Sequence, residues 1–175
     1  GEAQRIKLAA YLSKKSKQNT LYILDEPTTG LHSFDVDILI KALNKLVDQG
    51  NTVICVEHHM DLIRNADHVI DLGPESGENG GTVIYQGSLK GLLNEKNSYT
   101  GKALQLFLEK TDLKKYTEKK TPDSIRHISF KSVRTNNLKN IDIDIPANQI
   151  TAVTGLSGSG KSSFAMNLVE IFFFF

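Results

Sequence analysis

The stretch TGLSGSGKSS, at residues 154–163, constrains the fold of this chain more than any other feature. Gly155, Gly160, Lys161 and Ser162 satisfy the pattern G-x-x-x-x-G-K-[ST], which is typical of a phosphate-binding loop. Such a loop joins a buried strand to a helix, and the apolar run ITAV precedes it here while SSFAMNLVE follows it. The sequence therefore predicts an α/β protein in which a parallel sheet carries this loop at one edge.

Each part of the loop has a chemical task in this pattern. Small residues let backbone N–H groups curl around a phosphate, helped by the positive end of the following helix. We expect Lys161 to reach the β- and γ-phosphates of ATP, and the Ser162 hydroxyl to ligate Mg²⁺. The predicted nucleotide-binding residues of the loop are Gly155, Ser157, Gly158, Ser159, Gly160, Lys161, Ser162 and Ser163.

The acidic residues that a nucleotide site needs lie far upstream, in LYILDEP at 21–27. Its apolar run is typical of a strand buried on both faces of a parallel sheet, which would place Asp25 at the carboxyl edge. We expect Asp25 to bind Mg²⁺, and Glu26 to orient and deprotonate the attacking water. Taken alone, the pattern fits a strand that ends in a solvated acidic turn equally well. The two halves of the site also stand in reversed order along the chain.

The periodicity of apolar residues predicts alternating strands and helices before a polar linker. The expected helices are 2–17, 34–48 (capped by Ser33 and ended by Gly50), 88–94 and 100–109. The expected strands are 21–24, 52–56, 68–72 and 82–87, with a loop at 73–81. The lysine-rich stretch 109–124 is interpreted as a linker and domain boundary. After it, the alternation in 127–154 predicts a mostly antiparallel β start that leads into the loop.

Composition excludes some classes of protein. The single cysteine, Cys55, allows neither a disulfide framework nor a cysteine-rich zinc site, and it fits a reducing, cytoplasmic setting. The net charge of +1 neither supports nor excludes contact with nucleic acid. No apolar run approaches the roughly 18 residues of a membrane helix.

Three segments occur in an informative order: GEAQRIKLA at 1–9, LDEPTTGLH at 24–32 and VEHH at 56–59. Together they resemble the C-terminal half of an ABC-type ATPase, with the end of its signature motif, its acidic strand, its D-loop and its switch histidine. The resemblance implies that Gly1 belongs to a turn that caps a γ-phosphate held by the opposite module. It also implies that His58 contacts the γ-phosphate and the attacking water. The remaining candidates are interpreted as structural residues: Cys55, His59, His68 and His127.

Longer segments resemble the UvrA family, the DNA-damage-recognition ATPase of bacterial nucleotide excision repair. They are QGNTVICVEHHMDLIRNADHVIDLGPESGENGG and VRTNNLKNIDIDIPANQITAVTGLSGSGKSS, and the resemblance covers about 1–109 and 127–168. The resemblance implies that the chain binds ATP and Mg²⁺ and comes from a longer UvrA-like protein, called the parent below. That parent is expected to be dimeric and cytoplasmic, with a paired ABC module and no membrane partner. The resemblance places DNA binding, a UvrB-like partner and zinc only in parent regions outside this chain. A solvated linker explains four lysines better than contact with DNA does: Lys114, Lys115, Lys119 and Lys120.

The two ABC modules of UvrA offer an explanation for the reversed order. Residues 1–110 are then expected to be the C-terminal part of one module, 111–126 a linker, and 127–175 the N-terminal part of the next. PTTGLH resembles the second module and GLSGSGKSSFA the first, as at the junction of a tandemly duplicated UvrA. A short UvrA-like paralogue linked to drug resistance is the other interpretation. The terminal IFFFF is interpreted as a truncation scar.

Other interpretations stay open. In the two-module interpretation, the chain alone hydrolyses ATP poorly or not at all, because Lys161 lacks the acidic strand of its own module. Asp25, Glu26 and His58 likewise lack their own loop. Alternatively, the halves fold as one circularly permuted nucleotide-binding core that pairs Asp25 with Lys161. A transporter ATPase, or an inactive remnant that acts as an interaction module, are further alternatives.

Overall fold

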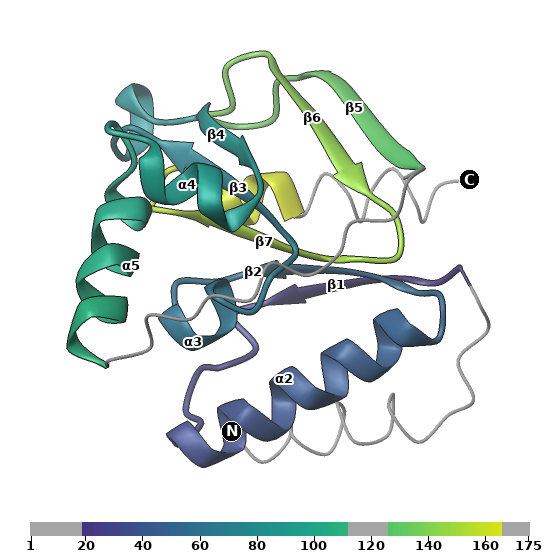
Figure 1. Ribbon diagram of the computed structural model, residues 1–175. Coiled ribbons are helices and arrows are strands. Elements are labelled where there is room, and N and C mark those ends of the chain that lie inside the picture. Colours follow the sequence, from purple (N-terminus) through teal and green to yellow (C-terminus); the bar gives the residue numbers. More distant parts are fainter. Residues whose placement is uncertain (1–18, 112–125, 166–175) are drawn as a thin grey trace.

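A five-stranded sheet forms the centre of the fold within residues 19–111 and 126–165, the part of the chain that the computed structural model describes (Figure 1). Its strand order is β1-β2-β7-β3-β4. The strands are β1 (Leu21–Asp25), β2 (Thr52–Val56), β3 (His68–Gly73), β4 (Thr82–Gly87) and β7 (Ile150–Gly155). β1, β2, β7 and β3 pair in parallel, whereas β4 is antiparallel to β3. The predicted α/β class is confirmed, and the predicted positions of β1 to β4 agree to within one residue.

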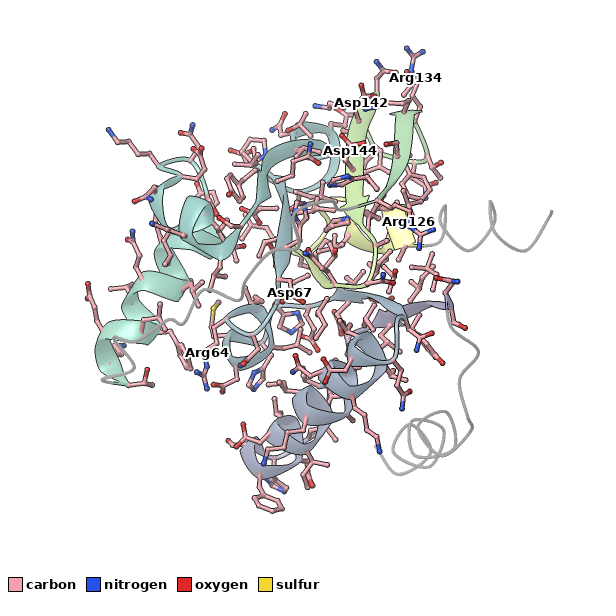
Figure 2. All side chains as sticks on the ribbon, turned by 45° about the vertical axis from the view of Figure 1, so that its right-hand side comes forward. Arg64, Asp67, Arg126, Arg134, Asp142 and Asp144 are labelled. Carbon is pink, nitrogen blue, oxygen red and sulfur yellow. The ribbon has the colours of Figure 1, made fainter. Side chains whose placement is uncertain are left out.

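β7 lies in the middle of this sheet although it is the last strand in the sequence. Its register places Cys55 beside Ala152 on one side, and Val69 beside Ala152 on the other. The turn before β3 also holds it, because the Ile150 N–H donates to Asp67 Oδ2 at 2.8 Å. Figure 2 labels Asp67 near the centre of the molecule. Strands from residues 19–111 and from residues 126–165 therefore share one sheet, as the permuted-core alternative expects.

A second, two-stranded sheet consists of β5 (His127–Val133) and β6 (Ile141–Pro146), which pair antiparallel. The expectation of an antiparallel start holds for these two strands but not for β7, which is parallel to its neighbours. Ile141, Ile143 and Ile145 of β6 are buried. Asp142 and Asp144 alternate with them, and Figure 2 shows both on the side of the molecule away from α2 (Ser33–Asp48). The alternation in IDIDI thus reports a half-exposed strand.

β1 departs from the expectation of a strand buried on both faces. Residues 21–24 are only half-buried. The physical reason is its place in the sheet, because β1 is the outermost strand in the described order and pairs with β2 alone. β2, which has neighbours on both sides, is buried along its whole length as predicted.

The helices lie where the apolar periodicity predicts them, with one addition. α2, α4 (Leu89–Asn94) and α5 (Tyr99–Lys110) match the expected ranges. α3 (Met60–Ile63) was not predicted, because four residues are too short to show helical periodicity. Within residues 19–111 and 126–165, no helix has the length and apolarity needed to cross a membrane.

The start of α2 differs from the prediction that Ser33 caps it. His32 occupies the N-cap position with an extended backbone and no capping bond from its side chain, and Ser33 is already helical. Gly50 follows the helix with φ of 85°, as the predicted stop signal requires, since this left-handed backbone favours glycine. The predicted helix 2–17 lies outside the described residues.

Two apolar clusters cover the two faces of the central sheet. One contains Leu43, Leu62, Leu89 and Leu104 from the helices, packed with Val69 and other side chains of one sheet face. The other joins the opposite face to the second sheet, and its largest members include Ile54, Ile70, Ile143, Ile145 and Phe164. Since β7 contributes to both clusters, the two faces are expected to unfold together.

Replacing Ile150 with alanine tests the central position of β7. Ile150 is 2% exposed, so Ile150→Ala should lower the free energy of unfolding by about 2–5 kcal/mol in a single transition. The control Ile38→Ala, on a side chain that is 51% exposed, should cost about 0.5 kcal/mol or less. Urea unfolding followed by circular dichroism measures both. Two separate transitions would contradict a shared core.

Candidate nucleotide-binding site

The carboxyl ends of the parallel strands meet at one edge of the sheet and bring the two halves of the candidate site together. Asp25 is level with Val56 of β2, and Gly155 is level with Leu72 of β3. The phosphate-binding loop leaves β7 at Gly155, and a helix begins at Lys161. Loops at the carboxyl edge of parallel strands are where open α/β sheets bind ligands.

The loop needs glycine at positions where its backbone turns tightly. Gly155 has φ of 130°, and a Cβ there would lie 2.0 Å from the Leu72 carbonyl oxygen. Gly158 has φ of 75°, a left-handed conformation that glycine adopts without steric cost. The glycines that the sequence pattern singled out therefore answer a conformational need of this loop.

Neighbouring segments hold the loop from outside. The Gly77 N–H donates to the Gly158 carbonyl at 3.0 Å, and the Gly81 N–H donates to the Ser159 carbonyl at 3.0 Å. Asn137 Nδ2 adds a bond to the same Gly158 carbonyl at 2.9 Å. Sequence reasoning quoted the stretches that contain Gly77, Gly81 and Asn137, but it gave them no task. These bonds show that the stretch 73–81 supports the phosphate-binding loop.

Lys161 extends along this loop. Its Nζ donates to the carbonyls of Gly155 at 3.0 Å and Leu156 at 2.8 Å. Burial lowers the pKa of Lys161, whereas the charges of Glu26, Asp25 and Asp71 oppose that shift. Two neutral carbonyls are weaker acceptors than an anionic phosphate. The ammonium group therefore fits a phosphate at this position.

The serines of the loop differ in exposure. Ser157 and Ser162 are exposed, and Ser163 is half-buried. Ser163 Oγ accepts a hydrogen bond from Asn136 Nδ2 at 3.1 Å. Ser159 Oγ is buried and has no hydrogen-bond partner within the described residues. A buried hydroxyl without a partner is costly, so Ser159 retains bonding capacity inside the loop.

Asp25 ends β1 at the same edge, and Glu26 follows it. Burial raises the pKa of Asp25, the charges of Glu26 and Glu57 add to the shift, and Lys161 opposes it. A cation would relieve this crowding of negative charge. Carboxylate and hydroxyl oxygens are ligands that Mg²⁺ prefers, so Asp25 with Ser162 fits that ion. Among the described residues, no group of three or more His, Cys, Asp or Glu side chains forms a metal cluster.

Glu26 and His58 lie beside each other. His58 Nδ1 is 3.8 Å from Glu26 Oε1, and the two side chains are 64% and 49% exposed. Glu26 has φ of 45°, which is uncommon for a residue other than glycine. Its N–H donates to the Val56 carbonyl at 2.9 Å, which ties it to β2. The pair is therefore open to solvent, while its backbone is held by the sheet.

Sequence reasoning missed two buried carboxylates at this edge. Glu57, which is 0% exposed, follows β2 directly and accepts hydrogen bonds from both flanking loops. Asp71, on β3, accepts hydrogen bonds from hydroxyl groups of Ser98, Thr100 and Thr154 at 2.6, 2.8 and 2.7 Å. The available signal was the same in both cases: an acidic residue within or directly after a buried apolar strand.

His59, His68 and Cys55 differ in their surroundings. His59 Nδ1 accepts from the Asp61 N–H at the start of α3, at 3.3 Å. Cys55 is fully buried, and its burial raises the pKa of the thiol. Burial also lowers the pKa of His68 to about 4. Gly1, the four linker lysines and the terminal IFFFF lie outside the described residues.

Fold and loop together define an α/β protein with a phosphate-binding loop at the carboxyl edge of its sheet. No protein-family model matches the chain. It is 46% identical to UvrABC system protein A of Staphylococcus aureus (strain Mu50), over 93% of this chain and 17% of that protein. It is 59% identical to the same protein of Clostridium perfringens, over 62% of this chain and 12% of the relative.

A solved structure agrees with these relatives. The crystal structure of UvrA2 from Deinococcus radiodurans matches 91% of this chain and 19% of that chain, at 40% identity and a TM-score of 0.54. The chain is therefore a homologue of a part of UvrA. It spans less than a fifth of the length of these relatives.

Acid should destabilise the fold through His68. The pKa of His68 falls from 6.5 to about 4 on folding, because burial disfavours the imidazolium, His127 adds to the effect and Asp144 opposes it. Between these values the unfolded chain binds the proton and the folded chain does not, so the free energy of unfolding falls as the pH falls. We expect a loss of about 2 kcal/mol at most between pH 7 and pH 5.

Urea unfolding at the two pH values measures this difference. His68→Gln should reduce the difference, whereas His32→Asn, at an exposed histidine, should leave it unchanged. An equal pH dependence in the wild type and in His68→Gln would contradict the assignment.

Proposed function

We propose that this chain binds ATP with Mg²⁺ at the carboxyl edge of its sheet, as the nucleotide-binding part of a UvrA-like protein. The observation that carries the proposal is that Asp25, at the end of β1, and the loop that leaves β7 at Gly155 lie at the same carboxyl edge of one sheet, although more than a hundred residues separate them in the sequence. The charges of Asp25 and Glu26 also act on the pKa of Lys161, where they oppose the effect of burial. An ammonium group in a glycine-rich loop, with carboxylates at the same edge of the sheet, is suited to a metal-bound triphosphate.

Binding is assigned to the loop and to Asp25. Backbone N–H groups of residues 155–163 would surround the β-phosphate, and Lys161 would exchange its loop carbonyls for phosphate oxygens. Ser162, exposed at the start of the helix, and Asp25 would hold Mg²⁺. When bound, Mg²⁺ neutralises charge on the phosphates.

Hydrolysis is assigned to Glu26 and His58. Glu26 is exposed and next to His58, so a water molecule has access to its carboxylate. Glu26 would orient that water and accept its proton, as a general base does. His58 would donate a hydrogen bond toward the γ-phosphate from the adjacent loop. The proximity of Glu26, as the base, to His58, as the orienting group, supports this division of roles.

The wider function follows from homology and is part of the proposal. A UvrA-like parent would recognise damaged DNA in nucleotide excision repair, in the cytoplasm, with a UvrB-like partner and a paired ABC module. Contacts with DNA and with that partner would belong to other regions of the parent. The shared sheet supports a single nucleotide-binding core to which residues from 1–110 and 127–175 contribute, with 111–126 between them, and Gly1 would face a γ-phosphate of an opposite module. Hydrolysis by this chain alone is then expected to be slow, because that second module is needed to complete the site.

Removing the lysine of the loop tests nucleotide binding. Lys161→Ala should weaken the affinity for ATP about tenfold or more, because a charge-assisted hydrogen bond to phosphate is lost. The control is Lys131→Ala, since Lys131 lies on β5 and faces Asp142 and Asp144 at 4.0 and 3.7 Å. Isothermal titration calorimetry with ATP and Mg²⁺ measures both. Equal affinities in the two variants would contradict the site.

Removing the candidate base tests hydrolysis. Glu26→Gln should bind ATP with the affinity of the wild type but hydrolyse it at least about a hundredfold more slowly, since the amide does not take the proton. The control is Glu109→Gln, at an exposed acid of α5. Single-turnover hydrolysis with protein in excess measures the rate. Rapid multiple turnover by the wild-type chain, lost in both Glu26→Gln and Lys161→Ala, would contradict the expected need for a second module.

A further inference from the structure

Glu57 is a fully buried carboxylate between the two loops that carry Glu26 and His58. Its Oε1 accepts from the Thr28 N–H at 2.8 Å and from the Thr28 hydroxyl at 2.5 Å. Its Oε2 accepts from the His58 N–H at 2.9 Å and from the His59 N–H at 3.0 Å. The carboxylate thus bridges the segment after β1 and the segment after β2.

This arrangement suits a carboxylate and no neutral side chain of the same size. A carboxylate only accepts hydrogen bonds, and four donors meet its two oxygens here. Burying a charge is costly unless it is hydrogen-bonded, and these donors offset that cost. A glutamine has only one oxygen, so its NH₂ group would face one pair of these donors. Both that NH₂ group and the donors opposite it would then lack an acceptor.

One end of the bridge holds the turn that presents Glu26. The Thr29 N–H donates back to the Glu26 carbonyl at 3.1 Å, so Thr28 lies inside that turn. Glu26 itself has φ of 45°. A left-handed residue other than glycine persists only where its surroundings hold it in place. The bonds from Thr28 to Glu57 supply part of that restraint.

The other end of the bridge holds the backbone of His58. The His58 side chain is 64% exposed and that of Glu26 is 49% exposed, so surrounding side chains restrain neither of them fully. Their separation of 3.8 Å between Nδ1 and Oε1 therefore depends mainly on where the two backbones lie. Glu57 bonds to both backbones at once.

We propose that Glu57 is a positioning residue that sets the position of Glu26 relative to His58. It acts through Thr28 on one side and through the His58 and His59 amides on the other. Glu57 itself touches neither nucleotide nor water in this role. The inference deepens the proposed function and depends on it for its catalytic consequence, but the bridge itself can be tested without nucleotide.

A matched control lies at the opposite end of the same strand. Asn51 directly precedes β2, as Glu57 directly follows it, and both are 0% exposed. Asn51 Nδ2 donates to the Leu46 carbonyl at 2.9 Å, and its Oδ1 accepts from the Thr20 N–H at 3.1 Å. Asn51→Ala therefore removes buried polar contacts of β2 without touching the candidate site.

Amide hydrogen exchange followed by NMR tests the bridge. In Glu57→Gln, the amides of Thr28, His58 and His59 should exchange at least about tenfold faster, while that of Ile54 in the middle of β2 stays protected. Asn51→Ala should leave the three amides unchanged. Unchanged exchange in Glu57→Gln, or the same acceleration in Asn51→Ala, would overturn the inference.

ATP binding and single-turnover hydrolysis test the consequence. Glu57→Gln should keep the wild-type affinity for ATP within about threefold and lose at least about tenfold in hydrolysis rate, since misplacing catalytic groups slows the chemical step. Thr28→Ser, which keeps both donors to Oε1, should behave as the wild type. Weakened ATP binding in parallel with hydrolysis, or a wild-type rate in Glu57→Gln, would overturn the positioning role.

The two proposals fail in different ways. A wild-type chain that binds no ATP would refute the proposed function, and the exchange pattern in Glu57→Gln would still decide whether the bridge exists. A chain that binds ATP and loses it in Lys161→Ala, but keeps its exchange pattern in Glu57→Gln, would refute the bridge alone.

Discussion

The pairing of β7 with β2 and β3 is the constraint on which the rest of the structure depends. Parallel pairing brings the carboxyl ends of these strands to one edge, and it buries β7 between two apolar clusters. The phosphate-binding loop can only leave the sheet where β7 ends. The distance between this loop and Asp25 is therefore set by the order of the strands in the sheet. The number of residues between them in the sequence does not set it.

Charge at this edge is balanced over several residues. Lys161 is a largely buried cation whose pKa is lowered by burial, and Asp25 is a carboxyl whose pKa is raised by burial. Each partly compensates the other, but the acids outnumber the lysine. Such an excess of negative charge is common where a protein holds a metal ion. Glu57 joins the segments after β1 and β2 by hydrogen bonds, and Asp71 joins the start of α5 to β7.

Features that depend on residues close together in the sequence could be predicted, and features that depend on distant segments could not. The range of α2 could be predicted from the spacing of its apolar residues, and the loop from fixed glycine positions, because these depend on neighbours in sequence. The half-burial of β1 could not, because it follows from its place at the end of the strand order. Glu57 was missed for the same reason: its donors on Thr28 come from a different strand end.

The sequence by itself determined the chemistry that this protein can offer. It contains the loop from Gly155 to Ser163, the acids Asp25 and Glu26, and the segments that identify a relative of UvrA. Only the tertiary structure decided that the reversed halves meet in one sheet, that Glu26 lies 3.8 Å from His58, and that Glu57 joins their loops. The physical reason is that residue type and spacing act through local conformation. Strand order and buried hydrogen bonds arise only when distant segments exclude water together.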